Sequence, residues 1–128
     1  MSTYTNPVGV SGPFGGYSHL CAVPANSRWL FIAGQVGTDA NGNTPENVED
    51  QCKIVFQNIK NCLNAGGMEL NDLVKLTVFL LSRDDLPSYR LARDAILGEI
   101  KPPTTLVIIS GLAKPIWKVE IEAYAAKA

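Results

Sequence analysis

The sequence predicts an α+β fold, a single mixed β-sheet with two helices on one face. Two segments carry apolar residues at three- and four-residue spacing, which is typical of amphipathic helices. Five other segments are apolar and β-branched or alternate with period two, as strands do. The order along the chain is therefore ββαβαββ. A length of 128 residues suits one domain, which we expect to span residues 1–128.

Two strands are predicted before the first helix, over residues 17–23 and 29–36. The turn at residues 24–27 is expected to join them as a hairpin. The segment before them, residues 7–16, is rich in Gly and Pro and predicts irregular backbone that can lie close to other groups.

The first helix is predicted to begin with Thr44 as its N-cap and Pro45 in the first turn, and to end at Gly66-Gly67. One stripe of apolar side chains would be buried: Val48, Cys52, Val55, Phe56, Ile59, Cys62 and Leu63. The next segment, residues 70–81, contains the run LVKLTVFLL, which is too apolar and β-branched for an exposed helix. It predicts a central strand buried on both faces.

The second helix is predicted to begin at residues 84–87 and to end before Pro102-Pro103. Two strands follow, over residues 104–110 and 118–125. In the last strand apolar residues alternate with Glu120 and Glu122, so both carboxylates share one face. Because the helices cover only one face of the sheet, we expect another copy of the chain to cover the other face.

Composition excludes several classes of partner. A net charge of −1 gives no electrostatic reason to expect nucleic acid or an anionic membrane as partner. Three cysteines, at spacings that match no zinc motif, and one histidine predict no metal site. Reduced thiols and the lack of signal-peptide features lead us to expect a cytoplasmic protein.

Several motifs resemble the reactive-intermediate deaminase (Rid, YjgF-like) family, in order and in register over nearly the whole chain. These are Gly16-Tyr17-Ser18, Leu30 to Val36 with Gly37 and Asp39, Gln51 to Leu63, Val74 to Leu80, Pro103-Thr-Thr, and Val119-Glu-Ile-Glu-Ala123. The resemblance implies a chorismate-mutase-like fold and a homotrimer with clefts between subunits. It also implies hydrolysis of enamines and imines to a 2-oxo acid and ammonia, as in 2-iminobutanoate/2-iminopropanoate deaminases, without a cofactor or metal.

The resemblance assigns site residues to matching positions. Glu120 matches the catalytic carboxylate that positions water; its alternative role is that of a surface or salt-bridging glutamate. Tyr17 and Gly34 match substrate-binding positions of the cleft; the alternatives are a packed aromatic side chain and a glycine required at a strand end.

One position departs from the family pattern. The family's carboxylate-binding arginine corresponds to Thr105, whose single neutral hydrogen bond replaces two charge-assisted ones. The loss amounts to roughly a few kcal/mol at a desolvated site, so the deaminase activity is expected to be weakened. Arg90, on the second helix, is a candidate for the missing cation. Its alternative role is a solvated arginine paired with Asp94 or Asp85.

Three functions are therefore considered. The first is binding of a small metabolite in an intersubunit cleft, with enamine/imine hydrolysis. The second is a non-catalytic ligand-binding or chaperone-like trimer. An endoribonuclease ranks last, because metal-free RNA cleavage usually needs an acid–base pair and a cation beside the phosphate, and the chain has one histidine and no basic face.

Overall fold

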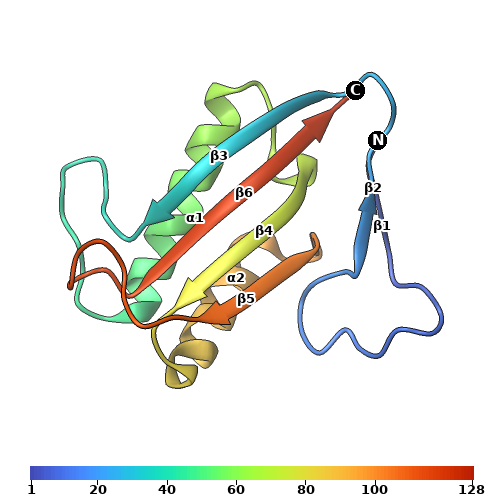
Figure 1. The fold of residues 1–128 in the computed structure, drawn as a ribbon. Helices are drawn as coiled ribbons and strands as arrows, with labels where there is room; N and C mark the ends of the chain where they lie inside the picture. The colour runs from blue at the N-terminus through green and yellow to red at the C-terminus, as the bar shows by residue number, and fades with distance from the viewer.

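A four-stranded mixed sheet with the strand order β3-β6-β4-β5 forms the body of the molecule (Figure 1). The computed structural model describes residues 1–128. β6 is antiparallel to β3 and to β4, whereas β4 and β5 are parallel. Helices α1 and α2 pack on one face, which confirms the predicted fold class. The bounds are β3 Arg28–Val36, α1 Val48–Ala65, β4 Leu73–Leu80, α2 Leu86–Leu97, β5 Thr104–Ile108 and β6 Val119–Lys127.

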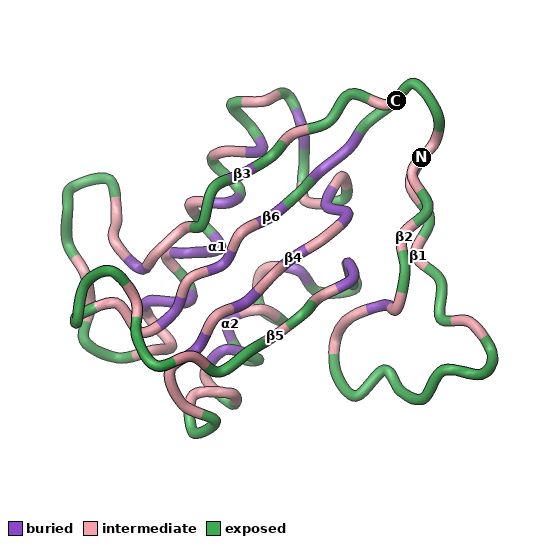
Figure 2. The backbone as a smooth tube through the Cα atoms, in the orientation of Figure 1, coloured by how far each residue is buried: buried purple, intermediate pink, exposed green.

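The core lies between the helices and one face of the sheet. Every second residue of β6 is fully buried there, as are alternate residues of β4 (Figure 2). β4 was predicted to be buried on both faces, but in the single chain Lys75, Thr77 and Phe79 are only half-buried. These residues and their neighbours on β6 form the uncovered side of the sheet, which we call the open face. None of the helices combines the length and apolar character needed to cross a membrane.

A separate two-stranded sheet is formed by β1 (Thr3–Thr5) and β2 (Leu20–Ala22) beside the main body (Figure 1). The sequence predicted a strand over residues 17–23 in a hairpin with β3. Instead β2 is three residues long and its backbone groups pair with β1, so the expected hairpin does not form. The Tyr4 hydroxyl donates to the Leu73 carbonyl over 2.6 Å and ties the small sheet to the start of β4.

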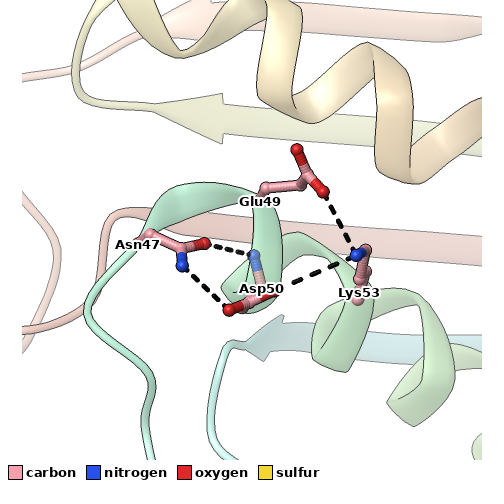
Figure 3. Close-up of polar contacts among 4 residues, drawn as sticks. All are labelled: Asn47, Glu49, Asp50 and Lys53. Carbon is pink, nitrogen blue, oxygen red and sulfur yellow. Dashed lines mark hydrogen bonds and ion pairs between the residues drawn. The ribbon is translucent and has the colours of Figure 1, made fainter.

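The N-cap of α1 is Asn47, three residues after the predicted Thr44 (Figure 3). The Asn47 Oδ1 accepts from the Asp50 backbone N–H over 2.8 Å, and its Nδ2 donates to the Asp50 carboxylate over 2.8 Å. Lys53 pairs with Glu49 at 3.1 Å one turn further on. The Thr44 hydroxyl instead bonds to the Thr38 hydroxyl over 2.7 Å.

Replacing Asn47 by Ala is expected to lower the free energy of unfolding by about 1 kcal/mol, because the Asp50 N–H loses its cap acceptor. Urea denaturation followed by circular dichroism measures the change. Asn43→Ala is the matched control, since Asn43 is exposed and uses only its backbone in hydrogen bonds. Equal effects of the two substitutions would contradict the assignment of the cap.

Candidate functional site

Glu120 lies on the open face, half-buried, against the backbone of β3. A β-bulge between Ile32 and Gln35 brings Gly34 beside it. A Cβ atom on Gly34 would overlap the Glu120 carboxylate oxygen and come within 2.8 Å of its Cδ. Gly34 is therefore required where Glu120 is seated, and the structure brings these two predicted residues together. No ion pair of the chain involves Glu120.

Thr105 also faces the open side, where it contacts Lys75. The Lys75 ammonium donates to the Thr105 hydroxyl oxygen over 2.7 Å, across the parallel pairing of β4 and β5. Thr77 pairs with Thr105 on one side and with Glu122 on the other, so these three residues form a row across the sheet. Sequence reasoning missed Lys75, although it is the one charged residue in the apolar run of β4.

An aromatic cluster occupies the same face beside Lys75. Tyr124 is the cross-strand partner of Lys75 and of Phe31, and its ring meets that of Phe31 edge-on at 5.2 Å between centroids. The Phe31 ring stacks on Trp29 at 6.1 Å. Phe31 is 71% exposed in the single chain. The open face therefore combines an unpaired carboxylate, a cation and an uncovered apolar patch.

Tyr17 and Arg90 lie elsewhere, in a cavity of about 320 Å³ between the N-terminal loop, α2 and β5. Thr104 lines this cavity, whereas the next residue, Thr105, contacts Lys75 on the open face. Side chains alternate along a strand, so the cavity and the open face lie on opposite sides of β5. The structure thus groups Tyr17 with Arg90, apart from Thr105.

Arg93 connects the N-terminal loop to this cavity. Its guanidinium pairs with Asp94 at 3.0 Å and lies over the Tyr89 ring, 5.5 Å from the centroid. Gly16 packs so closely that a Cβ there would come within 2.9 Å of the Arg93 Cζ. Burial raises the pKa of Tyr89 to about 12, so its hydroxyl is neutral at physiological pH. The Asp94 carboxylate is thus paired with Arg93. Arg90 forms no ion pair, so its alternative pairing with Asp94 or Asp85 is not observed.

No group of three or more His, Cys, Asp and Glu side chains is placed to hold a metal ion. The open face itself offers two carboxylates, those of Glu120 and Glu122, able to accept from water, and an ammonium–hydroxyl pair able to donate to an anion.

Comparison with known proteins places the chain in a family. The family model described as Endoribonuclease L-PSP matches residues 10–127. The chain belongs to this family, which is the Rid (YjgF-like) family. The RutC family protein PH0854 of Pyrococcus horikoshii is 38% identical over 117 residues, 90% of each chain. The 2-iminobutanoate/2-iminopropanoate deaminase of Salmonella typhimurium is 30% identical over 102 residues, 77% of this chain and 79% of the other.

A solved Rid structure has the same fold. The conserved Rid family protein YyfB of Yersinia pestis, described as of unknown function, superposes with a TM-score of 0.87 at 28% identity over 98% of each chain. The resemblance drawn from the motifs is thereby confirmed at the level of family and fold.

Gln51 holds the start of β6 in place from inside the core. It is fully buried on α1, and its Nε2 donates to the carbonyls of Pro45 and Ile116, each over 2.9 Å. Its Oε1 accepts from the Lys118 backbone N–H over 2.9 Å. One side chain therefore joins the segment before α1 to the start of β6, two residues from Glu120. In the sequence, the only indication of this role is an uncharged polar residue among the apolar positions of the predicted helix.

Replacing Gln51 by Leu is expected to lower the free energy of unfolding by about 3 kcal/mol, because three partly buried backbone groups lose their partner and the buried side chain loses all its hydrogen bonds. Chemical denaturation measures this loss, and hydrogen exchange at the Lys118 amide should become faster. Gln57→Leu is the matched control on the exposed side of α1, where Gln57 donates only to Asn61. A Gln51 variant as stable as the Gln57 variant would show that the hydrogen bonds of Gln51 do not stabilise the fold.

Proposed function

We propose that the chain binds a small metabolite on the open face around Glu120 and hydrolyses small imines and enamines to a 2-oxo acid and ammonia. The observation that carries this proposal is the Glu120 carboxylate, which is half-buried, without a salt-bridge partner and seated against Gly34 on an uncovered face. The deaminase relative, whose name gives 2-imino acids as substrates, supports the same reaction class.

The reaction needs few groups. Glu120 accepts a hydrogen bond from a water and orients its oxygen toward the C=N carbon. A C–O bond forms, the π electrons move to nitrogen, and Glu120 transfers the proton of the water to that nitrogen. Glu120 then accepts the hydroxyl proton of the tetrahedral adduct and passes it to the nitrogen, so the C–N bond breaks, ammonia leaves and the C=O group forms. No electrons are gained or lost, so no redox partner is needed.

The ligand cleft, in this proposal, is completed by a second copy of the chain in a homotrimer. Phe31, Trp29 and Tyr124 remain 71%, 45% and 37% exposed on the open face. Contiguous exposed apolar side chains of this kind are typical of surfaces that are buried by a partner. Burial by a neighbouring subunit would also exclude water from Glu120 and strengthen its interactions with the ligand.

Two alternatives have specific observations in their favour. Thr105 in place of a guanidinium favours a protein that binds the same ligands without catalysis. The description of the matching family model names an endoribonuclease. Against that activity, the sole histidine, His19, has its Nε2 2.8 Å from the Ser11 carbonyl and forms no ion pair with an acidic group. RNA cleavage therefore ranks third.

Hydrolysis can be measured by generating 2-imino acids with an amino-acid oxidase and following the competing formation of semicarbazones. We expect the wild-type protein to divert imine from semicarbazone, and Glu120→Gln to lower this activity about 100-fold or more through loss of the base. Gly34→Ala should lose activity similarly while keeping its thermal midpoint, because the added Cβ displaces only the flexible end of Glu120.

Glu122→Gln is the matched control, since Glu122 lies two residues along the same strand and the same face. An equal loss in the Glu122 variant would remove the specific role of Glu120. Absence of hydrolysis by the wild-type protein, across several imino acids, would reject catalysis in favour of ligand binding alone.

A further inference from the structure

We propose that Lys75 on β4, acting together with Thr105, anchors the carboxylate of the ligand on the open face. The inference rests on the proposed function and deepens it, because it names the residues that bind the carboxylate of the ligand. It also identifies a specificity-determining residue that is neither Arg90 nor a residue of β5.

Lys75 is a cation on the open face that has no acidic partner. It is the only Lys or Arg of β4 and β5, and no acidic group lies within ion-pair distance. Arg28 on β3 donates to the Gly66 carbonyl over 2.8 Å, and Lys118 donates to the Glu46 carbonyl over 2.8 Å. Lys127 stands at the last residue of β6, opposite Arg28.

The hydrogen bond between Lys75 and Thr105 has a fixed direction. An ammonium only donates, so the Thr105 oxygen accepts, and the hydroxyl hydrogen is free to donate to a third group. Lys75 retains two further N–H donors. The pair thus offers two donors whose heavy atoms lie 2.7 Å apart, a spacing that suits the two oxygens of one carboxylate.

This pair reproduces the main properties of a guanidinium fork with two residues. It has one full positive charge and two adjacent donors, one charge-assisted and one neutral. It also occupies the position at which the family places its arginine, because Thr105 is one half of the pair. The charge comes from the neighbouring strand, to which the parallel register of β4 and β5 brings it.

Neighbouring groups restrict the ligand further. Glu120 on β6 is the cross-strand partner of Phe79 on β4, whereas Thr105 on β5 is the partner of Thr77. Glu120 and Thr105 are therefore two strands apart and are offset by two residues along the strand direction. Two strand spacings are roughly 10 Å between backbones. The Glu120 carboxylate is seated against Gly34 on β3, on the far side of β6 from Thr105, so the pair and the Glu120 of the same chain do not both reach one short acid. Tyr124, opposite Lys75, offers an apolar wall for the substituent.

On this face, a preference for a carboxylate over a neutral ligand depends on Lys75 and Thr105. Glu120 and Glu122 repel an anion, so an acid binds there only if a cation offsets them. Arg90 lines the cavity on the other side of β5 and therefore acts on a different volume in the single chain. Lys75, in contrast, lies on the same face of the sheet as both carboxylates.

The test compares binding of 2-oxobutanoate with that of its neutral amide, 2-oxobutanamide, by isothermal titration calorimetry on the full chain. We expect the wild-type protein to prefer the acid. Lys75→Met, which keeps the aliphatic stem, should weaken acid binding at least tenfold and leave amide binding within twofold. Thr105→Val should weaken acid binding several-fold. Lys53→Met is the matched control, since Lys53 on α1 pairs with Glu49 and should change neither affinity.

A rescue variant tests whether charge at this point is what matters. Lys75→Met combined with Thr105→Arg should recover the preference for the acid, because a guanidinium then replaces the pair. Thermal midpoints and size-exclusion profiles of all variants establish that folding and association are retained. If Lys75→Met itself fails to fold, Lys75→Arg, which keeps the charge, must retain the preference for the acid.

The outcomes separate this inference from the proposed function. Unchanged acid binding in Lys75→Met, or an equal loss for acid and amide, overturns the role of Lys75; the proposed function then still stands if Glu120→Gln lacks hydrolysis. Loss of acid binding in Lys75→Met with full hydrolysis in Glu120→Gln supports the anchor and rejects the role of Glu120. A wild-type protein that neither binds 2-oxobutanoate nor hydrolyses imines overturns both.

Discussion

The register of β6 between its two antiparallel neighbours is the constraint on which the site depends. Alternate residues of this strand, from Val119 to Ala125, are fully buried under the helices. A slip of one residue would place Glu120 and Glu122 in the core, where unpaired carboxylates are strongly disfavoured. Hydrophobic burial on one face thus holds the carboxylates on the other. Gln51 adds a second restraint by bonding the segment before α1 to the residues that precede β6.

Elements with strong local signals were predictable from sequence, and those with weak signals were not. The apolar stripe of α1 and the alternation of β6 extend over enough residues to identify both elements and the faces they bury. The start of α1 was misplaced because Thr44 and Asn47 are both able to cap a helix, and only the backbone geometry selects Asn47. β1 and β2 have three residues each, too few for periodicity, and their pairing spans a long loop.

The site was predictable only in part, for a related reason. Glu120 and Gly34 were assigned by motif resemblance, and the bulge in β3 that joins them has no sequence signal of its own. The contact between Lys75 and Thr105 joins residues thirty positions apart through a parallel register set by the α2 crossover. Arg90 was considered as the missing cation from its helical position alone. Arg90 reaches the helix side of the edge strand β5 and not the open face. The packing of α2 against the sheet decides this, and residue spacing in the sequence does not predict it.

Dividing an anchor between two strands changes its physics as well as its composition. A guanidinium carries its two donors in one rigid plane, whereas the Lys75 ammonium must be held by Thr105 at a cost in side-chain entropy. The Thr105 hydroxyl offsets part of that cost, because it orders the Lys75 ammonium before the ligand binds. The two donors also depend on the pairing of β4 with β5, an edge strand of five residues. Ligand binding should therefore stabilise that edge, and any partner that covers it will in turn tune the affinity of the site.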